Sequence, residues 1–336
     1  MPKTNKNSTL FVVLNFNGWQ ETPACIDSVK QQTDKDFHIL LIDNGSKDDS
    51  LKKLQQYDND PVVTFHKEPV NLGFAGGVNI GIKKAISEGY GYIALLNNDA
   101  TLTKSWLQIL KKVLKDHDDV AVATGLLLES TGKLIESTGD SYSSYGLPFP
   151  RQREDPVDEA LDSGYVFGGT AGASVYKTEL FKDIGLFDET FFAYFEDTDI
   201  SYRAQLAGYK AYYEKSAVAY HDHGTTSSKM PGFTLFQTFK NQPVFLWKNV
   251  PIQLFFGTAL RFYACYALMF IRSIVNGQFL VAARGMLKSI ALFPHALRER
   301  RRIQSSRKVT IPYLRSIIHK GLPSSKRPFY KRIFHR

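Results

Sequence analysis

At 336 residues, the chain is long enough to bury one sizeable core and to carry an additional element. Cys25 and Cys265 are its only cysteines, which excludes a disulfide framework and a cysteine-rich metal site and fits a reducing compartment. The apolar run at residues 10–14, behind a polar N-terminus, is too short for a signal-peptide core, so secretion is not expected.

The net charge of +9 is distributed unevenly. Residues 244–336 contain 18 Lys and Arg but a single acid, Glu299, and therefore carry +17. The remainder has 24 basic and 32 acidic residues, a net charge of −8. An acidic body with a basic tail predicts two tasks, chemistry in the body and attachment to an anionic surface by the tail.

The first half of the chain alternates strand-like apolar runs with amphipathic segments, a pattern typical of a parallel sheet covered by helices. The expected strands are residues 10–15, 37–43, 62–66, 92–97 and 120–128. The expected helices between them are residues 23–31, 48–57, 75–88 and 106–115.

Polar residues gather where these strands end, the side of such a sheet on which ligands bind. They are Asn15, Asp43, Asn97, Asn98 and Asp99. An acid after a buried strand is well placed to hold a hard divalent cation, and the amides before Asp99 could add an oxygen ligand. Asp99 could equally be a turn residue or a cap for the helix that follows Thr103.

A glycine-rich loop, residues 71–79, lies between an expected strand and an expected helix. Its glycines would let backbone N–H groups and a helix N-terminus approach a phosphate or a ribose. The loop matches neither G-x-G-x-x-G nor G-x-x-x-x-G-K-[ST], which disfavours dinucleotide oxidoreductases and P-loop NTPases.

The next segment, residues 129–163, is rich in Ser, Gly, Asp and Pro and has no clear periodicity. It predicts a long surface excursion, a candidate acceptor-side loop. Order returns at residues 164–177, where Gly168, Gly169 and Gly172 indicate that the backbone closely approaches a ligand or another strand.

Three carboxylates, Glu196, Asp197 and Asp199, follow an aromatic run at residues 191–195. Apolar rings strip a carboxylate of water and raise its pKa toward values useful for proton transfer. The alternative is that Asp197 or Thr198 caps a helix at residues 200–207. Asp199 and Arg203, four residues apart, are expected to secure that helix.

Two histidines, His221 and His223, follow another strand-like run. In an extended segment both side chains would lie on one face, a reasonable geometry for metal ligands. The alternative is a hydrogen-bonded structural pair.

Residues 251–297 are apolar but are interrupted by Arg261, Arg272, Arg284 and Lys288. The longest uncharged stretch, between Arg261 and Arg272, has ten residues, against about 20 for a membrane-spanning helix. The pattern favours helices that lie in a membrane interface, with the arginine-rich residues 298–308 on anionic lipid. A basic helical subdomain packed on the body is the alternative, and aliphatic runs between the aromatics disfavour nucleic-acid binding.

Five motifs in order give the chain a family resemblance. They are Val12-Val13-Leu14-Asn15-Phe16-Asn17, Ile42-Asp43-Asn44-Gly45-Ser46, Asn71-Leu72-Gly73-Phe74, Leu96-Asn97-Asn98-Asp99 and Phe195-Glu196-Asp197. Over about residues 8–232 the chain resembles the family 2 inverting glycosyltransferases, and among them most nearly the bacterial rhamnosyltransferases of O-antigen and cell-wall polysaccharide synthesis.

The resemblance implies a nucleotide-sugar site in which Asp43 reads the base and Asn15 lines the same pocket. The further residues that it places in this site are Asn71, Gly73, Asn97 and Asn98.

The resemblance also implies a divalent cation, Mn²⁺ or Mg²⁺, bound by Asp99 as the acid of the D-x-D motif and by His221, which matches better than His223. Many relatives have Asp where this chain has Asn97 and Asn98, so fewer charges face the ion. Asp197 matches the general base, and Glu196 is expected to orient an acceptor or sugar hydroxyl.

The expected fold is therefore α/β of GT-A type, a Rossmann-like and mostly parallel central sheet flanked by helices, at residues 1–232. Residues 233–336 are expected to form a basic amphipathic helical region that associates with an anionic membrane. The expected reaction moves rhamnose from dTDP-rhamnose to a polyprenyl-diphosphate-linked saccharide, at the cytoplasmic face of the plasma membrane and by a peripheral protein. UDP-galactofuranose and UDP-N-acetylglucosamine are the alternative donors, and no nucleic-acid partner is expected.

Overall fold

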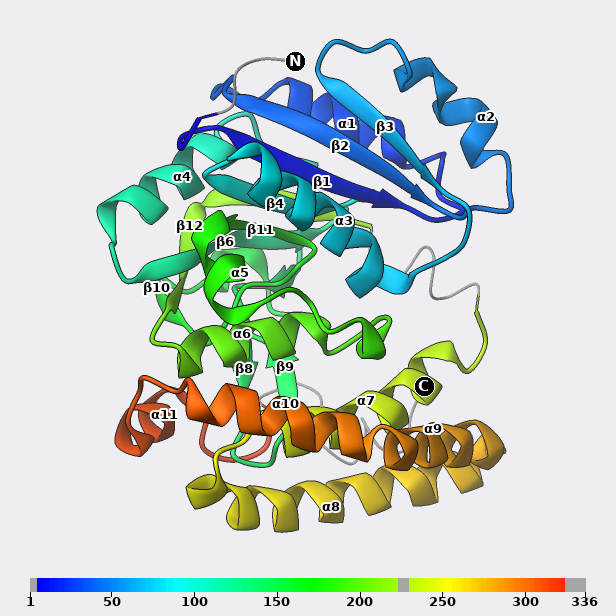
Figure 1. Cartoon of the computed structure of the whole chain (residues 1–336), viewed down its shortest axis with the longest axis vertical. Coiled ribbons are helices and arrows are strands. Elements are labelled where there is room, and N and C mark those ends of the chain that lie inside the picture. The colour runs from blue at the N-terminus through cyan, green and yellow to red at the C-terminus, as the bar shows by residue number, and fades with distance from the viewer. Residues whose placement is uncertain (1–4, 223–229, 324–336) are drawn as a thin grey trace.

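The computed structural model describes residues 5–222 and 230–323 (Figure 1). At its centre these residues form a ten-stranded sheet in the order β10-β12-β6-β11-β4-β1-β2-β3, with β5 beside β12 and β7 beside β6. The strands are β1 (Thr9–Asn15), β2 (Phe37–Asn44), β3 (Val63–Glu68), β4 (Tyr92–Asn97), β5 (Ala100–Leu102), β6 (Val120–Glu129), β7 (Ile135–Ser137), β10 (Gly164–Val166), β11 (Ala173–Lys177) and β12 (Lys210–His221).

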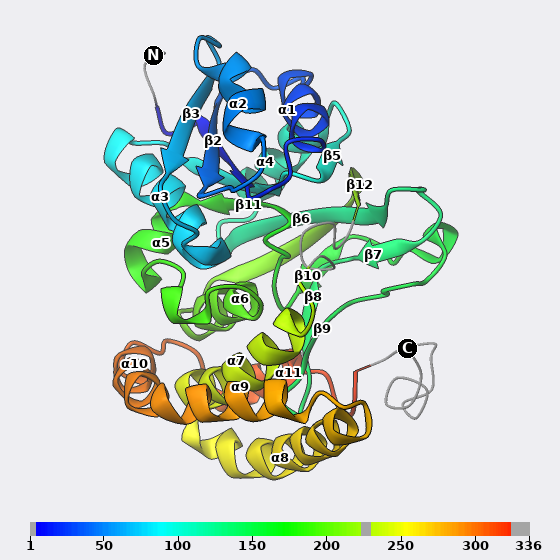
Figure 2. The same cartoon turned by 90° about the vertical axis from the view of Figure 1, so that its right-hand side faces the viewer.

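The first four of these strands pair in parallel, as does β12 with β6, while β11 is inserted antiparallel between β4 and β6. Helices cover this sheet on both faces (Figures 1 and 2). They include α1 (Thr22–Lys30), α2 (Ser50–Leu54), α3 (Gly73–Glu88), α4 (Trp106–Asp116) and α5 (Thr178–Ile184). The predicted α/β class with a mostly parallel sheet is confirmed.

Both faces of the sheet are buried, which explains why its strands read as unbroken apolar runs. Along β1, Leu10 and Val12 belong to the core cluster under α3, whereas Phe11 and Val13 belong to the cluster under α1 and α4. This two-residue alternation is the side-chain period of a strand. The expected elements of the first half are confirmed to within two residues, except that the second helix ends at Leu54 and continues as a 3₁₀ turn, η1 (Gln55–Tyr57).

The prediction of a long surface excursion at residues 129–163 is wrong. The segment contains β7 and the hairpin β8 (Asp140–Tyr142) and β9 (Pro148–Pro150). Tyr142 is 1 % exposed and packs with the rings of Phe167, Tyr202 and Phe245. The segment is ordered by contacts with residues that are distant in the sequence, so its structure could not be predicted from local periodicity.

Beyond the sheet, the C-terminal helices form a separate layer (Figures 1 and 2). They are α7 (Phe233–Asn249), α8 (Ile252–Val275), α9 (Phe279–Ala291), α10 (Phe293–Ser305) and α11 (Ile311–Ile317). A third core cluster joins this layer to the body, because it contains Tyr142 and Tyr202 together with Phe239 and Phe245 of α7 and Phe262 of α8.

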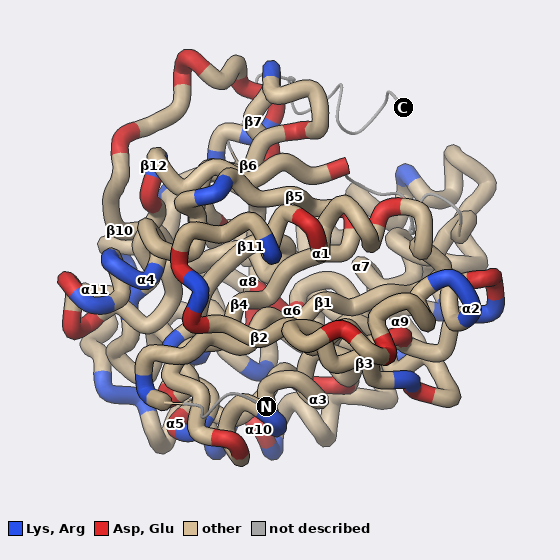
Figure 3. The backbone as a smooth tube through the Cα atoms, turned by 90° about the horizontal axis from the view of Figure 1, so that it is seen from above, with Lys and Arg blue, Asp and Glu red and all other residues tan. Residues whose placement is uncertain are grey.

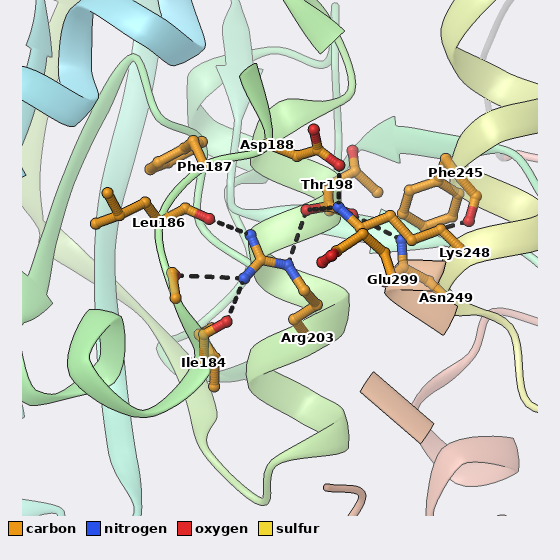
Figure 4. Close-up of polar contacts among 12 residues, drawn as sticks. Ile184, Leu186, Phe187, Asp188, Thr198, Arg203, Phe245, Lys248, Asn249 and Glu299 are labelled. Atoms are coloured by element: carbon orange, nitrogen blue, oxygen red, sulfur yellow. Dashed lines mark hydrogen bonds and ion pairs between the residues drawn. The ribbon is translucent and has the colours of Figure 1, made fainter. Parts of the chain in front are cut away.

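A buried polar network fastens α7 to helix α6 (Glu196–Leu206). Asp199 accepts a hydrogen bond from Arg203 Nε at 2.8 Å, and this confirms that the pair secures the helix. Asp199 also accepts from Lys248 Nζ at 3.0 Å and from Asn249 Nδ2 at 2.8 Å, both on α7 (Figure 4). Lys248 Nζ in turn donates to Asp188 at 2.6 Å. The sequence did not predict these contacts of α7.

Removing the charge of Asp199 should therefore be costly. Asp199→Asn leaves the buried Arg203 without its carboxylate partner and leaves Lys248 with Asp188 alone, and we expect the free energy of unfolding to fall by about 3–5 kcal/mol. The control is Asp116→Asn, which breaks the exposed i,i+4 pair with Lys112 and should cost less than about 1 kcal/mol. Chemical denaturation of both variants tests this, and equal losses would show that the network adds no stability.

Candidate active site

A cavity of about 630 Å³ lies at the ends of β1, β2 and β4. This volume is typical of a small-molecule site. Five of the side chains that line it are acidic, namely Asp99, Glu136, Asp140, Glu196 and Asp197, whereas Arg153 is its only arginine or lysine among the described residues.

Asp99 and His221 meet at one corner of the cavity. Strand β12 pairs with β5 so that His221 lies opposite Ala100, next to Asp99. His221 Nε2 is 2.9 Å from Asp99 Oδ1, and Nδ1 is 2.8 Å from Glu136 Oε2. The imidazole is 6 % exposed. Burial opposes its protonation, but hydrogen bonds with Asp99 and Glu136 prevail and raise the pKa of His221 to about 10.

The donor set of this corner fits a hard divalent cation. Asp99 offers a carboxylate oxygen, and His221 would offer Nε2 once a cation displaces the proton from that nitrogen. Glu136 holds the other ring nitrogen, as a carboxylate commonly does behind a metal-bound histidine. Among the described residues, no group of three His, Cys, Asp or Glu side chains forms a complete metal site. A cation held here would therefore take further ligands from a bound diphosphate and from water.

Glu196 and Asp197 form the first turn of α6. The helix begins at Glu196, and its N-cap is Phe195, which makes no side-chain capping bond. The alternative that Asp197 or Thr198 caps the helix is therefore wrong, because both residues already lie inside it. Asp197 Oδ1 accepts a hydrogen bond from Thr198 N at 2.7 Å, and its side chain lines the cavity.

Burial controls the charge of these acids. It raises the pKa of Asp197, and burial together with the neighbouring Asp197 raises the pKa of Glu196 to about 8. Glu196 is 7 % exposed, and its Oε2 has no hydrogen-bond partner within the described part of the chain. Asp140 also lies on the cavity wall, where burial and the charges of Asp197 and Glu136 raise its pKa well above the usual value. The proximity of Asp140, Glu196 and Asp197 therefore opposes the simultaneous ionisation of all three.

Asn15 and Asp43 lie behind the cavity wall. The two are paired in register on β1 and β2 and are fully buried. Asn15 Nδ2 donates to Asp43 Oδ1 at 2.8 Å, and Ser46 N donates to Asp43 Oδ2 at 3.1 Å. Neither residue is among those that line the cavity. Their contact with a nucleotide base stays a prediction.

Asn44, the last residue of β2, lines the cavity although the sequence interpretation assigned it no role. Its Nδ2 donates to Asn71 Oδ1 at 3.1 Å and to Gly73 O at 3.0 Å. It thereby fixes the loop before α3, so that Asn71 and Gly73 also line the cavity, as a phosphate or ribose site at a helix N-terminus would require. A role for Asn44 could have been predicted from the sequence, because it directly follows Asp43 at the end of an expected strand.

Asn97 and Asn98 both line the cavity, but they differ in their partners. Asn97 Nδ2 lies 3.2 Å from His221 Nε2, at the corner with Asp99. Asn98 Nδ2 points the other way and donates to Gly18 O at 3.0 Å.

Two functional candidates, Glu136 and Asp140, were missed because they lie in the segment that has no periodicity. His223 lies outside the described residues. The expected close approach to another strand is confirmed at Gly169, where a Cβ would lie 2.9 Å from Val122 Cγ1 of β6. Gly168 instead approaches a helix, since a Cβ there would lie 2.2 Å from Ser201 Oγ on α6.

Solved structures with a similar fold are glycosyltransferases. GalNAc-T7 with UDP, GalNAc and Mn²⁺ matches with a TM-score of 0.60 at 17 % identity, over 86 % of this chain and 56 % of that one. The mannosyltransferase PcManGT of Pyrobaculum calidifontis, with GDP-Man and Mn²⁺, matches with a TM-score of 0.53 at 11 % identity, over 89 % and 85 %. TarS residues 1–349 of S. aureus match with a TM-score of 0.52 at 16 % identity, over 89 % and 90 %. At these identities the likeness shows the fold alone, which is the GT-A fold.

The sequence narrows this class to a family. Residues 10–185 match the model of glycosyl transferase family 2, and the chain belongs to that family. An uncharacterized glycosyltransferase of Nostoc sp. is 26 % identical over 221 residues, 64 % of this chain and 65 % of the relative. The pre-mycofactocin glycosyltransferase of Mycobacterium tuberculosis is 30 % identical over 196 residues, 56 % and 38 %. An uncharacterized glycosyltransferase of Rickettsia felis is 36 % identical over 114 residues, 34 % of this chain and only 18 % of the relative.

The raised pKa of Glu196 predicts a pH dependence of stability. Its folded-state pKa of about 8 lies above the ordinary value of 4.5. Between these values the native state keeps a proton that the unfolded state has lost, so stability falls as the pH rises through this window. Glu196→Gln removes the effect, and its stability relative to the parent protein should increase from pH 4.5 to pH 8.

Denaturant titrations at several pH values within this window measure the difference. Glu189→Gln serves as the control, because the Glu189 side chain is 59 % exposed and should show no such trend. A pH-independent difference for Glu196→Gln would mean that Glu196 ionises normally in the folded protein.

Proposed function

We propose that this family 2 protein is an inverting glycosyltransferase that moves rhamnose from dTDP-rhamnose to a lipid-linked saccharide in cell-surface polysaccharide synthesis. The observation that carries the reaction type is the convergence of Asp99, His221 and Asp197 on one cavity. The rhamnose assignment rests on the resemblance of the five motifs. UDP-galactofuranose and UDP-N-acetylglucosamine remain the competing donors.

The proposed step has Asp197 as the general base. The acceptor hydroxyl gives its proton to the Asp197 carboxylate while its oxygen forms a bond to the anomeric carbon, and the bond from that carbon to the nucleoside diphosphate breaks on the opposite face. Configuration therefore inverts. Because burial raises the pKa of Asp197, this carboxylate is a better proton acceptor than an exposed one. Glu196, beside it on the cavity wall, orients the hydroxyl.

Asp99 and His221 would hold Mn²⁺ or Mg²⁺ at their corner of the cavity. Once bound, the cation supplies charge neutralisation for the departing nucleoside diphosphate. The need for such a counter-charge follows from the cavity itself, because its lining is predominantly acidic and includes one arginine, Arg153, and no lysine among the described residues. Mn²⁺ is present in the complexes of GalNAc-T7 and PcManGT, which supports this cofactor.

Asp197→Asn tests the assignment of the base. The amide keeps the size of the side chain but cannot accept the proton, so we expect transfer to fall by about 10²–10⁴-fold, with nucleotide binding nearly unchanged. Transfer is measured with dTDP-rhamnose, UDP-galactofuranose and UDP-N-acetylglucosamine, each with Mn²⁺ or Mg²⁺, and binding is measured by calorimetry with the matching nucleoside diphosphate. The exposed Glu189→Gln is the control. An equal loss of transfer and binding would point to a structural role.

An exposed apolar surface on α8 and α9 supports the proposed membrane association. Its large side chains are Ile252, Phe256, Leu260, Tyr263, Leu268, Ile271, Ile274, Val275, Phe279, Leu280, Leu287 and Ile290. Along α8 many of them recur every three or four residues, which places them in a stripe on one face of the helix. Phe256 and Leu260 are 75 % and 77 % exposed, and an exposed apolar surface of this extent is typical of a site that contacts a membrane or a protein.

The position proposed for this surface is in the plane of an anionic leaflet. By length and composition α8 could also cross a membrane, with 24 residues and a mean hydropathy of 1.6. The prediction that no stretch is long enough was too strict, because it counted only uninterrupted uncharged residues. The in-plane arrangement is favoured because Phe262 and Tyr266 of α8 are buried against the rest of the layer, and because Arg261 lies within the helix.

The basic residues of the C-terminal layer supply the matching charge. Seen from above, basic and acidic residues are interspersed over the α/β body (Figure 3), and residues 1–243 carry a net charge of −8. In the C-terminal layer, Arg261, Arg284 and Lys288 lie exposed on the two helices that carry the apolar stripe. A polyprenyl-diphosphate acceptor resides in the membrane and nucleotide sugars in the cytoplasm, so we place the protein peripherally on the cytoplasmic face.

The variant Phe256→Ser/Leu260→Ser should weaken binding to vesicles of anionic phosphatidylglycerol by at least about tenfold, since it removes two large apolar contacts. The control is Leu161→Ser/Tyr165→Ser, which removes two exposed apolar residues of the body. Co-sedimentation gives the affinities, and alkaline extraction of native membranes separates an in-plane helix from a spanning one. Unchanged binding of the first variant contradicts this docking surface.

A further inference from the structure

Helix α7 carries two Lys-Asn pairs, Lys240-Asn241 and Lys248-Asn249, at a spacing of eight residues. Eight residues are slightly more than two helical turns, so both pairs lie on one side of the helix. All four side chains are at most 5 % exposed. Such buried polar residues need partners, and those partners lie in the segment that carries the proposed catalytic acids.

The first pair holds the aromatic turn that precedes Glu196. Asn241 Nδ2 lies within hydrogen-bonding distance of three carbonyl oxygens, those of Phe191 at 2.9 Å, Ala193 at 2.9 Å and Tyr194 at 2.8 Å. Lys240 Nζ donates to the carbonyl oxygens of Thr190 at 3.0 Å and Phe191 at 3.1 Å. The two side chains of α7 thus contact four of the five carbonyl oxygens of residues 190–194, all except that of Phe192.

The backbone of this turn is strained. Phe192, Tyr194 and Phe195 have φ of 64°, 67° and 74°, values that residues other than glycine rarely adopt. Phe192 has ψ of −63°, and Ala193 N donates to Phe191 O at 2.7 Å, which is the strained form of the three-residue turn. Such conformations persist only where surrounding contacts hold them, and they cluster at functional sites.

The turn is also held from the nucleotide side. Phe192 O accepts a hydrogen bond from Ala75 N in the first turn of α3, at 3.2 Å. Gly73 packs so closely that a Cβ there would lie 2.3 Å from Phe192 O. The turn is therefore fixed between α3, which lines the cavity, and α7, which does so only at its first turn.

The second Lys-Asn pair fixes both ends of the same segment. Lys248 bridges Asp188, before the turn, and Asp199, after it, and Asn249 donates to Asp199 (Figure 4). Segment 188–199, which contains Glu196 and Asp197, is thus anchored at its two ends and along its strained middle by one helix.

We propose that Asn241, assisted by Lys240, is a positioning residue that holds the left-handed turn at residues 192–195 and thereby aims Asp197 into the cavity. This rests on the proposed role of Asp197 as the base. Without the amide donor, the strained turn relaxes and α6 begins in a different place. Asp197 then no longer meets the acceptor hydroxyl, whereas Asn71, which is held by Asn44, and Asp99, which is held by His221, are left in place.

The test compares Asn241→Ala and Asn241→Asp in the full-length protein. Asn241→Ala removes the donor, and we expect kcat of sugar transfer to fall by about 10- to 100-fold while KM for the donor stays within about twofold. Asn241→Asp replaces the donor by an acceptor that faces three carbonyl oxygens, so its loss should be at least as large, although it conserves size. Gln242→Ala is the matched control, because Gln242 is a buried amide on the same helix whose Oε1 lacks a hydrogen-bond partner among the described residues.

Hydrogen exchange supplies a readout that needs no substrate. The amides of residues 190–199 should exchange faster in both Asn241 variants than in Gln242→Ala, with exchange in the central sheet unchanged. Faster local exchange without any detectable transferase activity in the parent protein would support the positioning and contradict the proposed function. Measurable activity whose kcat and local exchange match those of Gln242→Ala would overturn the positioning role and leave the proposed function standing.

Discussion

The geometry of this molecule depends on the hydrogen bonds and ion pairs of the Asp199 carboxylate. This carboxylate is fully buried, and it accepts hydrogen bonds from Arg203 of its own helix and from Lys248 and Asn249 of α7. A lone buried carboxylate would be protonated or the fold would open, but two cations hold the pKa of Asp199 below its usual value in spite of burial. The same contacts fix α6 against α7. The position of Glu196 and Asp197, at the start of α6, follows from this.

The acids of the adjacent cavity have pKa values shifted in the opposite direction. Glu196, Asp197 and Asp140 have no arginine or lysine within hydrogen-bonding distance among the described residues, and burial raises the pKa of each. Asp199 is therefore a permanent charge that builds the fold, whereas Asp197, two residues earlier, can change its protonation state. This contrast separates a structural acid from a catalytic candidate in one helical turn.

The local sequence pattern was sufficient to predict the parallel strands in the first half of the chain. The strands around Val12 and Ile93 are apolar on both faces and end on polar residues, so both their position and the edge at which a site forms could be predicted. Asp99 and His221 were paired through family resemblance, and the structure brings them within 2.9 Å. Glu136 and Asp140 could not be predicted, because their segment is ordered only by distant partners such as the ring of Tyr202.

The strained aromatic turn was also beyond prediction from the sequence. Nothing local requires left-handed backbone at Phe192, Tyr194 and Phe195, since these residues disfavour it. The conformation is imposed by Asn241, about fifty residues later in the chain, and the sequence interpretation saw α7 only as part of an amphipathic tail. Tertiary contacts prevailed over local propensity there, as expected at a functional site.

Helix α7 belongs to both halves of the molecule, which limits how they can be separated. One side of it holds the strained aromatic turn through Asn241, and another packs on α9, where a Cβ on Gly285 would lie 2.7 Å from Phe236 O. Only a glycine allows the two helices to approach so closely. Removing everything after residue 232 would therefore delete the apolar surface together with the partners of Asp199 and of the strained turn. If such a truncation were soluble but inactive, the loss of these α7 contacts would explain the inactivity as well as the loss of the proposed membrane contact would. Substitutions on the outer face of α8 separate the two effects, because they leave α7 in place.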